Sequence, residues 1–152
     1  MKKNVLLLVV FILFSSCSDE PSALSIRWEP QREGVDSLWC AGDNIKWYNG
    51  TTGELKFKTE PSMEPGAQLA LYLNDEKLIS FVLADPYSSV SYIRPCIVVE
   101  PDGFYIRKSY FIYWEPDKMD EYKESAEENW KAIEPEWNIF IRQLKKEGRY
   151  RK

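Results

Sequence analysis

Residues 68–84, QLALYLNDEKLISFVLA, decide the fold because they contain a strand, a turn and a second strand in succession. Leucine recurs at every second position from residue 69 to residue 73, which is typical of a strand that buries one face. Residues 74–77 are turn formers, and residues 78–84 are apolar on both sides. This stretch therefore predicts a buried β-hairpin.

Two further hairpins are predicted, one on each side of this stretch. Residues 44–58 hold an alternating segment, a dense Asn-Gly-Thr-Thr-Gly turn and a second alternating segment. Residues 90–99 and 104–114 flank a Pro-Asp-Gly turn, and we expect the second arm to be the longest strand of the protein. Shorter strands are expected at residues 24–28 and 38–40.

The hydrophobic period changes after Pro116, where apolar residues begin to recur every three or four positions. The pattern predicts an amphipathic helix over residues 117–147, with Gly148 as its C-cap. An unbroken helix of this length would be about 46 Å long, whereas a compact domain of this size is about 37 Å across. Pro135 lies inside the helix, and the apolar stripe keeps its phase across it. We therefore predict a kink near residues 131–134.

Together these elements predict an α+β fold. We expect an antiparallel, meander-like sheet of about six to eight strands, curled or split into a small sandwich. The kinked C-terminal amphipathic helix lies across one face or end of this sheet. Residues 24–152 then form a single α+β domain, with strands between residues 24 and 114 and the helix at about residues 117–147.

The first twenty residues, MKKNVLLLVVFILFSSCSDE, have the form of an export signal. The apolar run from residue 5 to residue 14 is too short for a membrane-spanning helix of about 20 residues. Small residues then precede Cys17, and this arrangement resembles the lipobox of bacterial lipoproteins. The resemblance implies a signal peptide over residues 1–16, lipidation of Cys17 and a short tether over residues 17–23. The alternative is an ordinary secretory signal with an incidental cysteine.

The acidic residues after Cys17 bear on the location of the protein. Asp19 and Glu20 resemble the surface-export signal of Bacteroidetes-type lipoproteins, although an Asp at this position also resembles an inner-membrane retention signal of enterobacterial lipoproteins. Residues 47–54, WYNGTTGE, are similar to a segment of small gut Bacteroidetes lipoproteins of unassigned function. These resemblances imply a lipid-anchored protein of the outer membrane, at the cell surface or facing the periplasm.

The composition argues against several classes of function. Removing residues 1–16 takes away two lysines and no acid, so the formal net charge changes from −4 to −6. A negative balance argues against nucleic acid and against an anionic membrane surface as partners.

The chain has no histidine, which excludes Ser-His-Asp and Cys-His nucleophile systems and the commonest metal ligand. Glu100, Asp102 and Glu115 lie beside turns, and no catalytic pair stands out. We expect no enzyme, cofactor or metal site.

Cys40 and Cys96 are the two cysteines that remain in an oxidising compartment. A disulfide between them is one prediction, and by loop-closure entropy it would stabilise the fold by about 4 kcal/mol. The alternative is a pair of buried free thiols. Two cysteines without any histidine do not suffice for a zinc site.

Trp39, Trp47 and Tyr48 border loops in a chain that has six Trp and nine Tyr. Aromatic rings can stack on sugar rings while carboxylates and amides bind the hydroxyl groups. These three residues, with Asp43 and Asn49, are therefore candidate carbohydrate-binding residues. The alternative is that the rings fill the core under the sheet.

A modification site is also predicted in the polar loop before the second strand. Asp36, Ser37 and Leu38 resemble the Asp-Ser/Thr-apolar sequon of the O-glycosylation system of Bacteroidetes. The resemblance implies a glycan on Ser37, where it would be held in solvent.

These observations predict a membrane-anchored extracytoplasmic lipoprotein that acts as a binding or interaction module, with a glycan as one candidate ligand. An alternative is an immunity or inhibitor lipoprotein that binds a basic toxin or enzyme, because charge complementarity and aromatic anchors suit such an interface. A third possibility is a structural envelope protein. No nucleic-acid partner is expected.

Overall fold

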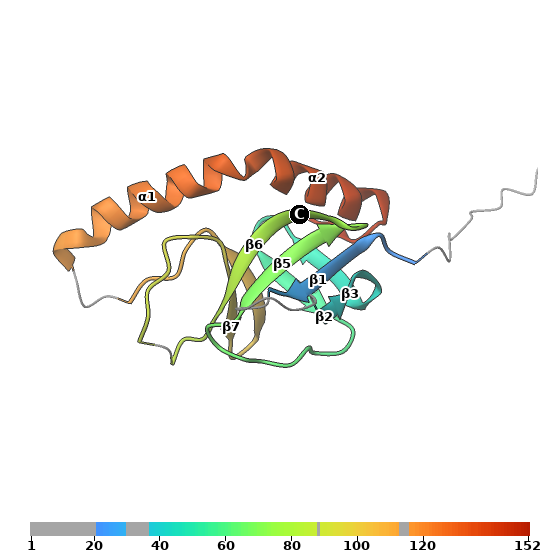
Figure 1. Ribbon diagram of the computed structural model, residues 1–152, viewed down its shortest axis with the longest axis horizontal. Helices are drawn as coiled ribbons and strands as arrows, with labels where there is room; N and C mark the ends of the chain where they lie inside the picture. The colour runs from blue at the N-terminus through green and yellow to red at the C-terminus, as the bar shows by residue number, and fades with distance from the viewer. Residues whose placement is uncertain (1–20, 30–36, 88, 113–115) are drawn as a thin grey trace, which may run out of the picture.

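The computed structural model describes residues 21–29, 37–87, 89–112 and 116–152 (Figure 1). In chain order the elements are β1 (Leu24–Trp28), β2 (Leu38–Ala41), η1 (Gly42–Asn44), β3 (Ile45–Asn49), β4 (Glu54–Phe57), β5 (Gln68–Leu73), β6 (Glu76–Ala84), β7 (Cys96–Glu100), β8 (Gly103–Arg107), η2 (Pro116–Lys118), α1 (Met119–Ala132), α2 (Glu134–Lys146) and β9 (Tyr150–Arg151).

The strands form one nine-stranded sheet in the order β2-β1-β5-β6-β7-β8-β4-β3-β9. The predicted hairpins β3–β4 and β5–β6 are both present, and the turn of the second is only two residues long, with Asn74 at a φ of 55°. The fold is α+β, but the prediction of a purely antiparallel meander is wrong. The pairs β6–β7 and β3–β9 are parallel, so the sheet is mixed.

The third predicted hairpin is shorter than expected. Strand β7 begins at Cys96 and β8 ends at Arg107, so the longest described strand is the nine-residue β6 and not the arm after residue 103. The flanking segments leave the ladder and meet again at the isolated bridge between Tyr92 and Tyr110. Both tyrosines pack on a second apolar cluster, which includes Val82 on β6. These segments therefore cover part of the sheet surface instead of extending the sheet.

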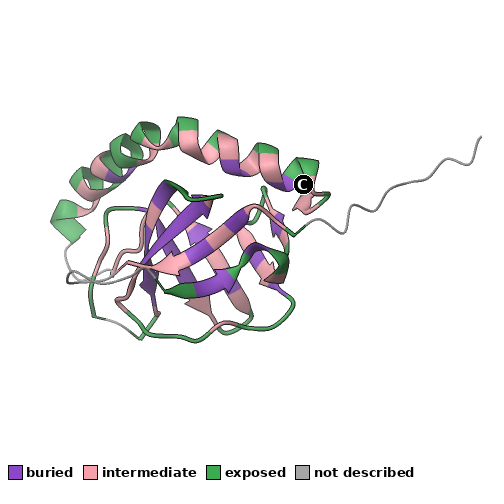
Figure 2. Cartoon of the chain, turned by 45° about the vertical axis from the view of Figure 1, so that its right-hand side comes forward, coloured by how far each residue is buried: buried purple, intermediate pink, exposed green. Residues whose placement is uncertain are grey.

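The sheet is curled around the main core. Trp39 on the β2 edge contacts Phe57 on β4 and Phe104 on β8, with ring centroids 5.7 Å and 6.3 Å apart. These strands are far apart in the strand order, so only a strongly curled sheet brings them together. Phe140 and Leu144 of α2 are buried in the same cluster. Figure 2 shows that most buried residues lie in the strands beneath the helices.

The C-terminal helix is interrupted at Ile133, within the range where the sequence predicts a kink. Pro135 lies in the first turn of α2, where its missing N–H group leaves no helical hydrogen bond unmade. The two helices follow one another along a single arch in Figure 1, and the angle of the predicted kink stays a prediction. Gly148 has a φ of 69°, and its N–H and that of Arg149 donate to the carbonyls of Lys145 and Leu144. This pattern is a Schellman C-cap, which confirms the predicted cap.

The predicted disulfide is wrong. Cys40 and Cys96 are both free and buried, and they belong to two different apolar clusters. Cys40 lies in the main core inside the curl, whereas Cys96 lies with Val82 and Val98 in the second cluster. The two thiols are thus on separate packed surfaces of the sheet. The alternative of two buried thiols agrees with this arrangement.

The predicted signal peptide, the lipidation site Cys17 and most of the tether lie outside the described residues. Within the described ranges, no helix is long and apolar enough to cross a membrane. Every described strand and helix lies between Leu24 and Arg151, so the described sheet and its core are built without the first twenty residues.

Candidate functional site

Two of the three predicted stacking rings are in the core. Trp39 is 7% exposed and donates its indole N–H to the carbonyl of Ser62, at 2.8 Å. Tyr48 is 6% exposed and packs edge-on against Trp137, with ring centroids 5.5 Å apart. Burial raises the pKa of the Tyr48 hydroxyl to about 12. The prediction that Trp39 and Tyr48 are exposed to stack on a sugar is therefore wrong.

The other predicted residues are engaged within the fold. The ring of Trp47 lies 4.4 Å from the guanidinium of Arg151. The side-chain oxygen of Asn49 accepts two backbone N–H groups of the turn that follows it. Asp43 is bound to the backbone of Ser22 and to a C-terminal arginine. The five candidates do not form one site. Ser37 is exposed, while Asp36, the first residue of its sequon, lies outside the described residues.

The structure instead forms a pocket at the end of the sheet where β6 and β7 finish. Because these strands are parallel, their carboxyl ends meet at the same edge, which places Asp85 beside Glu100. The tight β7–β8 turn adds Asp102, and the segment after β4 adds Glu60. We call this recess of about 350 Å³ the acidic pocket; it is lined by Glu60, Met63, Asp85, Pro86, Tyr87, Val99, Glu100, Pro101, Asp102, Gly103 and Phe104.

The lining of the acidic pocket holds four carboxylates and no basic side chain. Glu100 is paired with Arg107 on β8, at 3.1 Å. Asp102 accepts the hydroxyl of Tyr105 at 3.0 Å, and this bond raises the pKa of that hydroxyl. Burial, followed by the charge of Asp85, raises the pKa of Tyr110. The pocket is therefore a region of negative potential with only one neutralising cation among the described neighbours of its acids.

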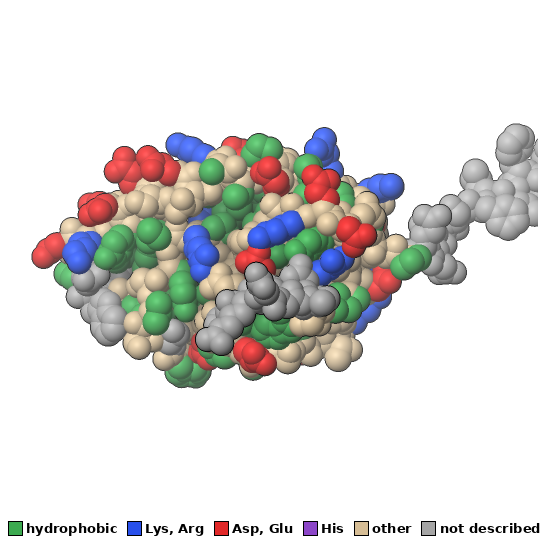
Figure 3. All heavy atoms as spheres, viewed as in Figure 1, with side chains coloured by type: hydrophobic (Ala, Val, Ile, Leu, Met, Phe, Trp, Pro, Cys, Tyr) green, Lys and Arg blue, Asp and Glu red, His purple; other side chains and the backbone are tan. Residues whose placement is uncertain are grey.

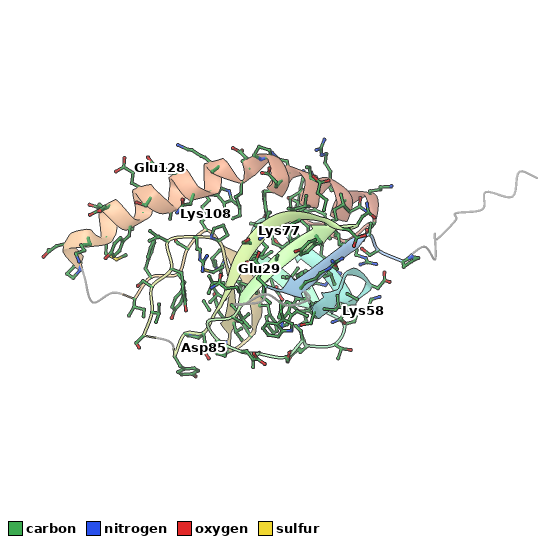
Figure 4. All side chains as sticks on the ribbon, in the orientation of Figure 1. Glu29, Lys58, Lys77, Asp85, Lys108 and Glu128 are labelled. Carbon is green, nitrogen blue, oxygen red and sulfur yellow. The ribbon has the colours of Figure 1, made fainter. Side chains whose placement is uncertain are left out.

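Apolar side chains are exposed beside these acids. Tyr87 is 90% exposed and Met63 is 57% exposed, although both are large hydrophobic residues. Asp85 holds the backbone of this loop, because its carboxylate accepts the N–H of Tyr87 at 2.7 Å. Figure 4 shows Asp85 at the lower end of the molecule, away from the helices. Exposed apolar groups beside unpaired charges are typical of a protein-binding surface.

Two other recesses have different linings. The largest, about 710 Å³, lies between the start of β6, residues 91–95 and the end of α1. Its two cations are already engaged, Lys77 with Glu29 and Arg94 with Gln68. A smaller recess of about 300 Å³ lies between the β3–β4 turn and the tryptophans Trp130 and Trp137.

Sequence reasoning recognised the acids at positions 100 and 102 but not their grouping. Local sequence carries no signal for it, because the grouping depends on the parallel pairing of β6 and β7 across the chain. Among the residues that the structure describes, no group of three or more acids or cysteines is arranged to hold a metal ion. No protein-family model, curated protein or solved structure matches the chain.

Proposed function

We propose that the chain is a lipid-anchored extracytoplasmic binding module whose acidic pocket binds a protein partner with basic and apolar side chains. The observation that carries the proposal is the four-carboxylate rim beside exposed Tyr87 and Met63. A lysine or arginine of the partner would fit among the carboxylates while an apolar neighbour covers the tyrosine ring. An inhibitor or immunity lipoprotein for a basic toxin or enzyme is the concrete case that this chemistry favours.

The position of the pocket relative to the anchor supports the proposal. The N-terminal segment joins the sheet beside the β5–β6 turn, where Asn74 donates its backbone N–H to the carbonyl of Ala23. The acidic pocket lies beyond the other end of β6. The nine residues of β6 span eight steps of about 3.3 Å, which separates the two by roughly 26 Å. An anchor on Cys17 would thus leave the pocket facing away from the membrane.

The carboxylates of the pocket are better suited to binding than to catalysis. Asp102 and Glu100 are held by Tyr105 and Arg107, so both carboxylates already have partners inside the fold. No nucleophile with an adjacent base lies among the lining residues. We therefore propose a module without enzymatic activity.

A crosslinking experiment tests the site. A photoreactive benzoylphenylalanine replaces Tyr87 in the lipidated protein, in cells, and the same residue replaces Glu128 on the exposed face of α1 as the control. Figure 4 shows Glu128 and Asp85 on opposite sides of the molecule. We expect one partner to crosslink at position 87 and not at position 128. Equal labelling from both positions would contradict the proposal.

A charge variant tests the chemistry of the site. Glu60→Gln with Asp85→Asn removes two charges, and the amide oxygen introduced at position 85 keeps the acceptor that orders the Tyr87 loop. Exposed ion pairs contribute roughly 0.3–1 kcal/mol each, so the affinity for the captured partner should fall about 3–30-fold. Glu124→Gln with Glu128→Gln on α1 is the matched control and should leave affinity unchanged. A partner that binds both variants equally well does not use the pocket.

A glycan ligand is the second candidate function, and the recess beside Trp130 and Trp137 favours it. Threonine hydroxyls at positions 51 and 52 line this recess together with the two tryptophans. Calorimetry against a panel of polysaccharides tests it, and a folded protein that gives no binding heat with any of them would exclude it. A purely structural role in the envelope would be supported if neither experiment yields a partner.

The anchor itself has an independent test. Cells fed a clickable palmitate should label the wild-type protein and not Cys17→Ser. An unlabelled wild-type protein would refute the anchor and leave the test of the acidic pocket intact.

A further inference from the structure

Charge is strongly segregated along the C-terminal third of the chain. Residues 142–152, RQLKKEGRYRK, hold six basic side chains and one acid. In α1 the balance is reversed, with five acids and two lysines. Figure 3 shows Lys and Arg side chains over the α2 end of the molecule and acidic side chains gathered along α1. We call the six basic residues, Arg142, Lys145, Lys146, Arg149, Arg151 and Lys152, the basic end.

Five of these six charges point into solvent. Arg149 is 19% exposed and is used within the fold, where it binds Asp43 at 3.1 Å and Glu147 at 3.4 Å. The other five side chains are exposed, and none forms an ion pair with an acid among the described residues. Arg151 lies over Trp47 and Lys145 over Tyr150, so these aromatic rings hold the cations outward without neutralising them.

The part of the basic end at the C-terminus of α2 is fixed beside the point where the N-terminal segment enters the fold. The hydroxyl of Ser22 donates to the carboxylate of Glu147 at 2.9 Å, and its backbone N–H donates to Asp43 at 2.9 Å. Asp43 and Glu147 both bind Arg149, and Gln143 donates its side-chain amide to Glu147 at 2.7 Å. We call this network the clasp. It joins Ser22 to the cap of α2, so the two regions cannot separate without breaking it.

The length of chain before Ser22 sets how far this end can be from an anchor at Cys17. Ser22 lies five positions after Cys17, and such a segment spans at most about 18 Å even when fully extended. A lipid-bearing Cys17 therefore holds the α2 part of the basic end within a short distance of the bilayer. Attraction of a cation to an anionic surface acts over a Debye length of about 8 Å at physiological salt.

We propose that the basic end is a membrane-contact surface that binds the anionic, phosphate-bearing headgroups of the bilayer that carries the anchor. This inference rests on the proposed lipid anchor and adds a second, electrostatic contact to it. Together, the two contacts would orient the domain and turn the acidic pocket outward. The net charge of −6, taken over the chain without residues 1–16, argues against an anionic membrane surface. That number is a sum over the whole chain, however, and the fold places acidic and basic side chains in different regions.

A purely structural explanation accounts for only part of the cluster. Cations in the last helical turn offset the negative end of the helix dipole, which explains Lys145 and Lys146. Arg149 is explained by the clasp. Arg151 and Lys152 follow the C-cap, where the dipole has no effect beyond the last turn. Both are exposed at the β3–β4 turn end of the sheet, and the structural explanation leaves their charge unaccounted for.

Vesicle flotation of the chain from residue 17 carrying Cys17→Ser tests the proposal. This protein has no lipid but keeps every described strand and helix of the fold. We expect it to float with vesicles of phosphatidylcholine containing 30% phosphatidylglycerol, and not with pure phosphatidylcholine vesicles. Binding to anionic vesicles should be lost in high salt.

The informative variant is Lys146→Gln with Lys152→Gln, because neither side chain makes a described hydrogen bond, ion pair or ring contact. Each cation near an anionic surface contributes about fivefold to partitioning, so the loss should be roughly 25-fold. Lys123→Gln with Lys131→Gln on α1 makes the same change in net charge about 35 Å and about 22 Å, respectively, along the helices from Lys146 and should have little effect. Both variants should keep the wild-type circular dichroism spectrum.

Several results would overturn the proposal. Equal flotation with neutral and anionic vesicles would mean that the contact is not electrostatic. Equal losses in the two double variants would mean that net charge matters and the basic end does not. No flotation at all would also refute it. Because the tested protein lacks the lipid, none of these results depends on whether Cys17 is acylated or on whether the acidic pocket binds a protein.

Discussion

The prediction that tests the fold most directly concerns Leu144. This side chain is 0% exposed and lies in the main core together with Phe140, so it is one of the two fully buried residues of α2. Leu144→Ala removes three carbon atoms, which costs about 2.5 kcal/mol in transfer free energy. The cavity left behind adds up to about 2 kcal/mol. We expect the free energy of unfolding to fall by about 3–4 kcal/mol.

Urea unfolding at 25 °C, followed by tryptophan fluorescence and far-ultraviolet circular dichroism, measures this loss. Leu38→Ala is the matched control, because it makes the same truncation at a side chain that is 59% exposed. The control variant should lower the free energy of unfolding by less than about 1 kcal/mol. If Leu144→Ala costs no more than the control, α2 does not pack inside the sheet and the described core is wrong. A native helix signal in the destabilised variant at low urea would show that the effect is on stability and not on helix formation.

Three further predictions concern single residues. Gly148→Ala should lower the free energy of unfolding by about 1 kcal/mol in the same assay, because its φ of 69° is unfavourable for a residue with a Cβ atom. Burial raises the pKa of Cys40 to about 11 and that of Cys96 to about 12, so neither thiol should react with Ellman's reagent at pH 8 until urea unfolds the protein, when both should react. The N–H of Ser22 holds the pKa of Asp43 below its usual value, so ionised Asp43 stabilises the fold above about pH 4 and this contribution is lost as the pH falls through its folded pKa. The stability difference between wild type and Asp43→Asn should therefore be present at pH 7 and shrink towards pH 3, and a difference independent of pH would contradict it.

Local patterns in the sequence were sufficient for the elements that are held together by neighbouring residues. The β3–β4 and β5–β6 hairpins follow from alternation around short turns, and Gly148 follows from the end of the apolar stripe. In each case the interacting residues are close in the chain. The pattern also showed that α2 buries one face, although not that this face enters a curled sheet.

The parts that were mispredicted depend on contacts between distant segments. The segment after Ala84 reads as a turn into an antiparallel strand, but the chain crosses to Cys96 and pairs in parallel. The two-residue strand β9 is too short to carry a periodic signal, and it exists because the C-cap of α2 directs Tyr150 onto β3. Cysteine count and compartment favoured a bridge between Cys40 and Cys96, yet neither quantity says on which face of a sheet a cysteine lies.

The candidate site was missed for the same physical reason. Carboxylates next to turns are common and usually solvated, so Glu100 and Asp102 alone indicate nothing specific. They become a pocket only because parallel pairing brings the end of β6, with Asp85, to the same edge. For the aromatic residues the error was the reverse, because the sequence predicted exposed binding residues that the structure buries. Trp39 and Tyr48 border loops in the sequence, but the curl of the sheet turns both inward.

The separation of the acidic pocket from the basic end leads to a last prediction. The acidic pocket lies beyond the end of β6 and the clasp beside its start, and these are about 26 Å apart along the strand, or about three Debye lengths at physiological salt. Charges at one end should therefore have almost no effect on binding at the other. Glu60→Gln with Asp85→Asn should leave partitioning into anionic vesicles within about twofold of wild type, whereas net charge alone would predict tighter binding. Lys146→Gln with Lys152→Gln should likewise leave crosslinking at position 87 unchanged in the lipidated protein. If each variant changed the result of both assays, binding at both surfaces would depend on the overall electrostatic field of the protein, and the two surfaces would not be separate sites.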